Sequence, residues 1–342
     1  MLPTARCPSG QTGAARRRHD APVRCGRGRD VVHWSREGTM RRRTWGITIG
    51  AVAAAALVAG GIGAAVQPSA PVETAAARST ATPTPTPSPT PTLPAVPAAA
   101  SEAELAALPL AFHDAVVPEL LDGSHVRPDN RWEIATPKQR LVALYADAAP
   151  DARPVATLAS TVSTIDTPAA TAVWGRSAGR DGGMVLVSTP ARNRTPGDGG
   201  DPTAPSATFA WARAADFTIA PTDRMIRVDV HASTVSVVAR DGSVSATEAA
   251  RLGTPDDPTP TSTATYVEAA YVDARVTYTQ GNPIILTGAH SSRIPQYGGN
   301  AALTALHYYP DPTGSSHGCV RISAAMTTTL SQLPVGTAIW FS

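Results

Sequence analysis

Residues 224–247 read RMIRVDVHASTVSVVARDGSVSAT, and this stretch decides the fold of the second half of the chain. Apolar and polar residues alternate along it, which is the pattern of half-buried β-strands. Two polar interruptions, at 231–233 and 241–242, are typical of the turns that join neighbouring antiparallel strands. The pattern therefore predicts a β-hairpin, not a helix.

Short runs of apolar and polar residues continue on both sides of this stretch. Downstream we expect strands at 264–273, 274–279, 283–289 and 302–309, a short helix at 323–333 and a last strand at 337–342. Upstream, short alternating runs between Gly, Pro, Asn and Asp predict a small SH3-like β-domain over 150–220, with a long loop at 193–206. The protein is expected to be mostly β, with a β-sandwich or barrel over 224–342 and no parallel α/β sheet.

Residues 101–149 carry helical patterns. These are EAELAALPLAFHDAVVPELL from residue 102, which includes His113, and PKQRLVALYADA from residue 137, which starts with a proline. We therefore expect a helical segment over 101–149, with His113 in a structural or surface role.

The amino-terminal residues indicate export. Residues 46–66 carry no charge and follow three arginines at 41–43. As a helix they would reach about 31 Å, close to the hydrocarbon thickness of a bilayer. A basic flank before an apolar run places the amino end in the cytoplasm and the rest outside. Residues 40–66 are either a cleaved signal peptide or a membrane anchor, and 1–39 are either a disordered leader or a misassigned translation start.

A linker rich in proline and threonine is expected over 67–100, because its centre alternates proline with small residues and favours polyproline II. Cys7 and Cys25 precede the apolar run, so Cys319 is the one cysteine beyond it. Outside the cell this cysteine has no disulfide partner, and it is either a buried small residue or a reactive thiol. We expect the protein to be extracytoplasmic, either anchored in the membrane or associated with the cell wall.

The net charge of +2 conceals an asymmetry. Eleven arginines and three acidic residues lie before residue 44, whereas the residues from 67 onward hold 18 basic and 24 acidic side chains, a net charge of −6. This mildly acidic bulk lacks the electrostatic footprint of nucleic-acid binding, and we expect no nucleic-acid partner.

Residues 315–321, SSHGCVR, are the sharpest local signal for chemistry. Gly318 removes side-chain bulk beside the sulfur of Cys319 and permits an unusual backbone angle. A thiol is mostly protonated at neutral pH, so a cysteine nucleophile needs a nearby imidazole. His307, at the end of the strand pattern ALTALH, and His290, at the end of PIILTGAH, are the two upstream candidates.

The block SHGCVR at 316–321, preceded by a histidine on a strand, resembles the catalytic domain of the L,D-transpeptidases of the YkuD type. The resemblance covers 224–342 and includes the opening hairpin and the GTAI ending at 336–339. Residues 259–263, TPTST, are similar to the TPTGT segment of the family but lack its glycine. The resemblance implies a YkuD-like fold and acyl transfer between peptidoglycan stem peptides, with an acyl-enzyme on the cysteine and no metal or other cofactor.

The resemblance also implies roles for the catalytic residues. Cys319 corresponds to the nucleophile and His307 to its base, while the backbone N–H groups of His317 and Gly318 would form the oxyanion hole. The histidine of the family usually precedes a glycine and stands farther from the motif, which keeps His290 as a rival base.

Three further residues are expected on the substrate side. Arg321 matches the basic or amide position of the motif, which contacts substrate or braces the loop, and Ser316 matches a serine that makes a loop hydrogen bond. If His307 is the base, a loop at 297–299 could cover the substrate and place His290 at the rim of the site.

Other functions compete with this hypothesis. The same site would give an L,D-carboxypeptidase if water accepted the acyl group, and a decayed site would leave a wall-binding protein. The three histidines and Cys319 could also bind zinc, since imidazole and thiolate are zinc ligands, although the two-residue spacing of His317 and Cys319 suits such a site poorly.

Overall fold

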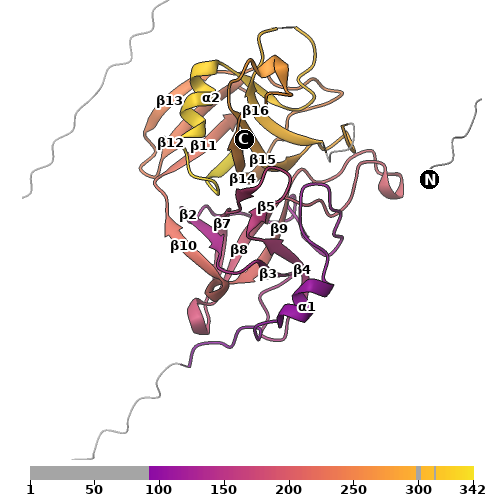
Figure 1. Ribbon diagram of the computed structural model, residues 1–342, viewed down its shortest axis with the longest axis vertical. Helices are drawn as coiled ribbons and strands as arrows, with labels where there is room; N and C mark the ends of the chain where they lie inside the picture. Colours follow the sequence, from indigo (N-terminus) through magenta and orange to yellow (C-terminus); the bar gives the residue numbers. More distant parts are fainter. Residues whose placement is uncertain (1–91, 298–301, 312) are drawn as a thin grey trace, which may run out of the picture. The chain divides into compact units, whose positions relative to one another are not determined.

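The computed structural model describes residues 92–297, 302–311 and 313–342 (Figure 1). The expected leader at 1–39, the signal peptide or anchor at 40–66 and most of the linker at 67–100 lie outside these residues, as do Cys7 and Cys25. Among the described residues, no helix combines the length and the apolar character needed to cross a membrane.

Residues 121–221 build an eight-stranded antiparallel sheet with the order β10-β2-β7-β8-β9-β3-β4, in which β1 pairs with β9. Its core is made of small and β-branched side chains such as Val142, Val173 and Val187, which suit a pleated, buried surface. The strands are β1 (Leu121–Asp122), β2 (Glu133–Pro137), β3 (Leu141–Tyr145), β4 (Pro154–Ala159), β7 (Thr171–Ser177), β8 (Met184–Thr189), β9 (Thr208–Arg213) and β10 (Phe217–Pro221). A small separate pair, β5 (Thr161–Val162) and β6 (Thr167–Pro168), lies between β4 and β7 in the chain.

The prediction of a helical segment over 101–149 is wrong beyond its first turns. Helix α1 (Glu102–Ala107) has a capping box between Ser101 and Glu104, but the chain leaves the helix at Leu108, directly before Pro109. The apolar run at 141–145 is β3, paired with β4 and β9. A run of five apolar residues fits a buried strand as well as a helix, and here pairing with distant strands decides.

The first sheet therefore begins well before residue 150, and the SH3-like character of 150–220 stays a prediction. The expected loop at 193–206 contains only one short 3-10 turn, η2 (Asp198–Gly200). Two further 3-10 turns, η1 (Arg180–Gly182) and η3 (Ala214–Asp216), flank β8 and β9 in the chain.

A second eight-stranded sheet, with the order β13-β12-β11-β18-β14-β15-β16-β17, is built from residues 224–341. The predicted hairpin is confirmed as β11 and β12, and β13 extends it. The pairs β11–β18 and β16–β17 are parallel and the other pairs are antiparallel. Its elements are β11 (Arg224–Asp229), β12 (Thr234–Ala239), β13 (Val244–Ala249), β14 (Thr263–Tyr271), β15 (Ile284–His290), β16 (Leu303–Tyr308), β17 (Val320–Ile322), helix α2 (Ala324–Ser331) and β18 (Ala338–Phe341).

The strand expected at 274–279 is absent, and a 3-10 turn, η4 (Thr277–Thr279), stands in its place. The cause is local, because the Asp273 carboxylate accepts a hydrogen bond from the backbone N–H of Arg275 at 2.9 Å. An aspartate that binds its own backbone two residues on starts a turn and competes with strand pairing.

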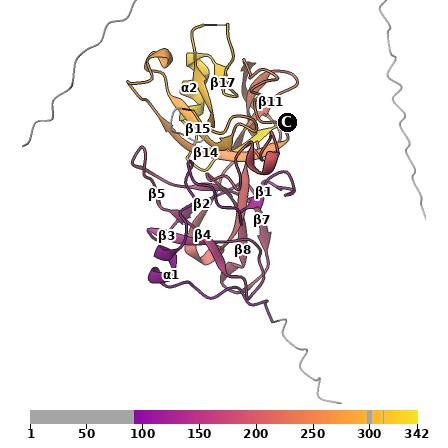
Figure 2. The same cartoon turned by 90° about the vertical axis from the view of Figure 1, so that its right-hand side faces the viewer.

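Side chains from both sheets share one buried cluster, which includes Trp174 and Phe209 from the first sheet and Tyr266 and Ala338 from the second. Helix α2 packs on β15 and β16 (Figure 2) and closes the separate core of the second sheet with Met326 and Leu330. The edge formed by β16 and β17, where the SHGC block enters β17, therefore packs against this core through Leu306 and Val320.

Candidate active site

The nucleophile candidate follows a tight turn at 316–319. The Cys319 N–H donates to the Ser316 carbonyl at 3.1 Å, and the two central residues, His317 and Gly318, have φ of +53° and +83°. Two positive φ values define a type I′ turn. Glycine adopts this conformation freely, and a Cβ at Gly318 would also lie 3.1 Å from the Pro258 carbonyl oxygen. The turn thus explains the H-G pair before the cysteine.

Cys319 is half-buried at the start of β17 and is the free cysteine of the described residues. It packs against an apolar cluster that includes Leu303 and Ala305 of β16. Burial raises the pKa of the Cys319 thiol, and the nearby backbone at Ala305 and the charge of Arg321 only partly oppose this effect. The resting sulfur is therefore a protonated thiol at neutral pH, and it needs a base to become a nucleophile.

His307 lies on the same face of the sheet as Cys319. In the parallel pair of β16 and β17, Leu306 is opposite Val320, and both belong to the core beneath α2. Since side chains alternate along a strand, His307 and Cys319 both point to the opposite face. The sequence hypothesis that places this histidine beside the thiol agrees with this register.

The hydrogen bond of His307 assigns its tautomer. Its Nδ1 lies 3.0 Å from the carbonyl oxygen of Tyr308, and because a carbonyl can only accept, Nδ1 carries the hydrogen. The lone pair is then on Nε2. Burial lowers the pKa of His307, so the ring is neutral at pH 7 and free to accept a proton. The centroid of the ring lies 5.4 Å from that of the Tyr278 ring, and the two planes are tilted by 57°.

His290 does not join this group, and the expectation that it lies at the rim of the site is wrong. It is 1% exposed at the end of β15, and its Nε2 lies 3.0 Å from the carbonyl oxygen of His113. Burial lowers the pKa of His290 to about 3. The physical reason is tertiary, because the loop around His113, 177 residues away in sequence, covers this imidazole. His290 therefore links that loop to β15.

Arg321 braces the loop, which is one of its two expected roles. Its Nη1 and Nη2 donate to the carbonyl oxygens of Thr313 at 3.1 Å and Ser315 at 2.5 Å. The guanidinium also lies over the ring of Tyr309, 3.9 Å from the centroid. Both terminal nitrogens thus hold carbonyl oxygens of the SHGC loop, and the expected contact of Arg321 with substrate stays a prediction.

The expected loop hydrogen bond belongs to Ser315 and not to Ser316. The Ser316 hydroxyl is buried and has no hydrogen-bond partner among the described residues. The Ser315 hydroxyl lies 2.6 Å and 2.5 Å from the two carboxylate oxygens of Asp257. The sequence could not distinguish the two adjacent serines, because the direction of the loop decides which hydroxyl reaches the Asp257 carboxylate.

His317 is exposed and is held on three sides. Its Nδ1 lies 2.8 Å from Asp257 Oδ2, its N–H donates to Ser315 Oγ at 3.0 Å, and its carbonyl accepts a hydrogen bond from the Tyr297 hydroxyl. Of the two backbone donors expected for an oxyanion hole, His317 N–H is thus occupied. The Gly318 N–H has no hydrogen-bond partner within the described part of the chain and remains available.

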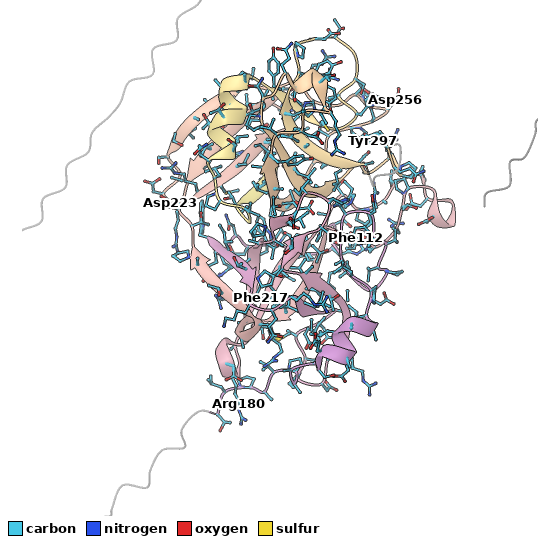
Figure 3. All side chains as sticks on the ribbon, in the orientation of Figure 1. Phe112, Arg180, Phe217, Asp223, Asp256 and Tyr297 are labelled. Atoms are coloured by element: carbon cyan, nitrogen blue, oxygen red, sulfur yellow. The ribbon has the colours of Figure 1, made fainter. Side chains whose placement is uncertain are left out.

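Asp257 is the functional residue that sequence reasoning missed. It is buried, and it also accepts a hydrogen bond from the Thr254 hydroxyl. Burial alone would raise the pKa of Asp257, but hydrogen bonds from Ser315 and Thr254 and the charge of His317 together hold it below its ordinary value. Figure 3 labels its exposed neighbour Asp256 and, on the same side of the molecule, Tyr297. The signal in the sequence was the pair Asp256-Asp257 inside an otherwise uncharged segment.

Tyr278 and Tyr309 were also missed. Their rings lie 5.3 Å apart, and each contacts the ring of His307. Burial, and then the neighbouring Cys319, raises the pKa of Tyr278. The two rings form an aromatic cluster with His307. Tyr278 contributes to it from η4, where a strand was expected.

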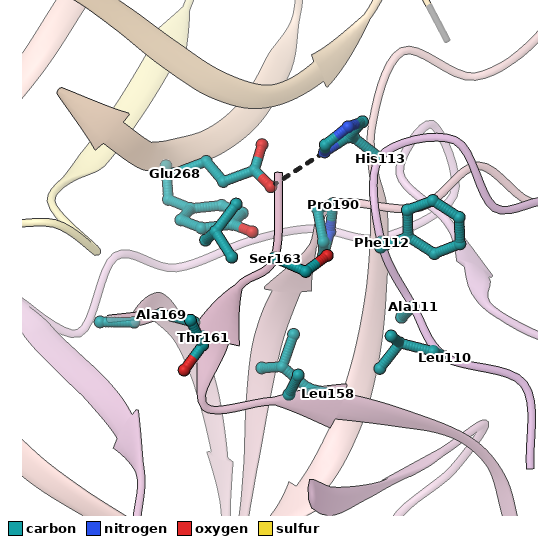
Figure 4. A pocket seen from close by; sticks show the side chains of 14 residues that line it. Leu110, Ala111, Phe112, His113, Leu158, Thr161, Ser163, Ala169, Pro190 and Glu268 are labelled. Atoms are coloured by element: carbon teal, nitrogen blue, oxygen red, sulfur yellow. Dashed lines mark ion pairs between the residues drawn. The ribbon is translucent and has the colours of Figure 1, made fainter. Parts of the chain in front are cut away.

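A second buried polar pair lies away from Cys319. His113 Nδ1 is 3.7 Å from Glu268 Oε1, and the residues are 7% and 3% exposed (Figure 4). They line a pocket walled by apolar side chains, among them Leu110 and Leu158. Burial raises the pKa of Glu268, and the nearby Glu268 carboxylate raises the pKa of His113. The expected helix around His113 is absent, and the residue is buried in a loop.

The residues around Cys319 lie within a match to a known protein family. Residues 223–340 match the family model of the YkuD L,D-transpeptidase catalytic domain. Within the matched residues, Ser262 stands where the TPTGT segment has glycine and takes φ of +49°, so the position keeps the left-handed backbone that favours glycine.

Several solved structures share a partial likeness. A mutant L,D-transpeptidase of Enterococcus faecium is 22% identical, with 35% of this chain and 50% of that chain covered and a TM-score of 0.25. An L,D-transpeptidase (Yku) of Stackebrandtia nassauensis is 19% identical, with 36% and 57% covered and a TM-score of 0.25. One from Mycobacterium smegmatis is 18% identical, with 46% and 90% covered and a TM-score of 0.28. The chain thus spans about half the length of the first two. None of the curated proteins matches it.

Proposed function

We propose that this protein is an exported cysteine L,D-transpeptidase that joins peptidoglycan stem peptides through an acyl-enzyme on Cys319. One observation carries the proposal. His307 holds its hydrogen on Nδ1, against the Tyr308 carbonyl, and lies on the same sheet face as the half-buried thiol. A neutral base with an unprotonated Nε2, on the face that carries a protonated thiol, is what nucleophilic acyl transfer requires. The match of 223–340 to the YkuD catalytic domain supports the choice of substrate.

The reaction begins from two uncharged groups. As the sulfur attacks the carbonyl that follows an L-centre in a tetrapeptide stem, His307 Nε2 takes the thiol proton. The Gly318 N–H is the available donor for the oxygen of the tetrahedral intermediate, a type of electrostatic stabilisation that contributes strongly in acyl transfer. The C–N bond then breaks, and His307 returns the proton to the departing amine of the terminal D-residue.

The second half of the reaction repeats these steps with another nucleophile. An amine of a neighbouring stem attacks the thioester, His307 takes its proton, and the sulfur leaves as the 3→3 peptide bond forms. Water in place of the amine would release a tripeptide, which is the carboxypeptidase reaction. The pair of His307 and Cys319 serves both outcomes, so the acceptor decides between them.

The uncharged segment at 46–66 behind its three arginines supports an extracytoplasmic location, where this substrate is found. The domain would then act outside the membrane, as an anchored or a wall-associated enzyme.

The decisive experiment incubates the full-length chain with a purified disaccharide-tetrapeptide and analyses the products by mass spectrometry. A cross-linked dimer together with the free D-residue is the expected result. Tripeptide monomer alone would assign the carboxypeptidase reaction, and neither product would point to a wall-binding protein. Cys319→Ala is the control, because any product it forms comes from another source.

A further inference from the structure

The turn that precedes Cys319 contacts a segment that lies far away in the sequence. Residues 254–258 lie directly under residues 315–318, since the Pro258 carbonyl approaches Gly318 and the Asp257 carboxylate meets Ser315 and His317. We propose that Asp257 is a positioning residue, which sets the conformation of the nucleophile turn through Ser315 and His317. This inference rests on the proposed function for its kinetic consequence.

The turn needs such support. His317 takes φ of +53°, a left-handed conformation that is uncommon for residues with a Cβ and that contacts with the surroundings help to hold. The ring of His317 is tied to Asp257, and its N–H is tied to the Ser315 hydroxyl, which in turn binds the same carboxylate. One buried acidic side chain thus controls both the side chain and the backbone of the strained residue.

Asp257 is itself fixed. The Thr254 hydroxyl donates to its Oδ1, and the Thr254 N–H lies 3.4 Å from the same oxygen. Asp257 is 8% exposed, and both oxygens of its carboxylate accept hydrogen bonds. The position of the Asp257 carboxylate is therefore set by its own segment, and the turn at 316–319 adapts to it.

The contact also assigns the hydrogen on His317. An ionised carboxylate only accepts, so Nδ1 of His317 must carry a hydrogen whether the ring is neutral or charged. Nε2 of the neutral ring is then the acceptor. An asparagine at 257 would keep an oxygen for Ser315 but present an amide donor toward His317, which would force the opposite tautomer.

Asp257 acts through geometry rather than through its field on the sulfur. The groups that shift the pKa of Cys319 are its buried surroundings, the backbone at Ala305 and Arg321. Loss of Asp257 should therefore slow acyl transfer without changing the pH at which the thiol ionises. Displacement of a reacting group by about 1 Å costs up to about 100-fold in rate, and we expect a loss of about 10- to 100-fold in Asp257→Ala.

The experiment compares Asp257→Asn and Asp257→Ala with Asp256→Asn, a matched control that removes the same charge from an exposed neighbour. Acylation of Cys319 by a carbapenem is followed by intact mass over a range of concentrations, with the full-length chain. We expect a lower maximal rate for both Asp257 variants, with Asn between wild type and Ala, and a half-saturating concentration within about two-fold of wild type. Asp256→Asn should behave as wild type.

Two further measurements keep the outcome unambiguous. Circular dichroism shows whether each variant is folded, and ¹⁵N spectra of the imidazoles report which nitrogen of His317 carries hydrogen. We expect Nδ1–H in wild type and in Asp256→Asn, and its loss in Asp257→Ala. Folded Asp257 variants that acylate as fast as Asp256→Asn would overturn the inference, and so would a wild type without Nδ1–H.

The two proposals fail in different ways. A wild type that neither reacts with the carbapenem nor forms product refutes the proposed function. The positioning role is then decided by the spectra, because a signal of His317 that changes with Asp257 and not with Asp256 supports it and an unchanged signal refutes it.

Discussion

The Nδ1 atom of His307 lies 3.0 Å from the carbonyl oxygen of Tyr308, the next residue of β16. This short-range bond leaves Nε2 as the basic nitrogen, and the parallel register with β17 turns the imidazole to the face that carries Cys319.

Cys319→Ala should abolish product formation and leave the fold intact, because only a half-buried sulfur atom is removed. A carbapenem should add its mass to the wild type and not to the variant. Intact mass spectrometry and a melting curve check both statements. Turnover by the folded variant would show that the nucleophile is another residue.

His307→Ala and His290→Ala should have different effects. We expect the first to slow acylation by about 10² because the base is lost. The second should reduce stability by about 1–3 kcal/mol, since a buried hydrogen bond to His113 is lost, while the folded fraction acylates normally. Single-turnover acylation and thermal melting separate the two, and the reverse ranking would make His290 the base.

Activity should persist below the usual imidazole range. Burial holds the pKa of His307 below 6.5, so the ring stays neutral, and able to accept a proton, as the pH falls through that value. Burial likewise holds the pKa of the thiol above 9.0, so alkylation of Cys319 should rise only at alkaline pH. Profiles of kcat/KM and of iodoacetamide labelling test this. An acid limb above pH 6.5, or a thiolate at neutral pH, would contradict it.

The pair of His113 and Glu268 should make the protein more stable on the acidic side of neutrality. Both groups have folded-state pKa values above their ordinary ones of 6.5 and 4.5, so the folded protein binds these protons more tightly than the unfolded chain. Their contribution is complete below the ordinary pKa and is lost as the pH rises through the folded value. This pair therefore lowers the melting temperature from pH 6 to pH 8, against the rise that the lowered pKa values of His290 and His307 produce in the same range.

Glu268→Gln should flatten this dependence, because it removes one titrating group and the main cause of the shift in His113. Glu119→Gln, which changes an exposed acid in the same segment as His113, is the control and should keep the wild-type slope. Equal slopes in all three proteins would show that the buried pair does not link stability to pH.

A reporter that is active only outside the cytoplasm should give a signal when it is fused after residue 100, because three arginines precede the uncharged run at 46–66. A signal from a cytoplasmic reporter at that point would contradict export. Fractionation of the untagged chain and the mass of its mature form then distinguish an anchor from a cleaved signal peptide.

Much of the second sheet could be read from the sequence, because its strands alternate polar and apolar residues and its turns carry Asp-Gly or similar pairs. The candidate nucleophile could also be found from the sequence, since Cys319 stands in a specific motif with Gly318 beside it. Prediction failed at 141–145 and at 274–279. There a short apolar run paired with distant strands, and the side chain of Asp273 bound its own backbone.

The sequence by itself determined the chemistry that the site can perform, because the thiol, the imidazole and the flexible glycine belong to single residues of one short motif. Only the tertiary structure decided which side chains meet. It buried His290 under the loop of His113 and brought Asp257 to Ser315 across 58 residues of chain. The physical reason is that local patterns follow from the alternation of side chains, whereas contacts between distant segments depend on how two whole sheets pack.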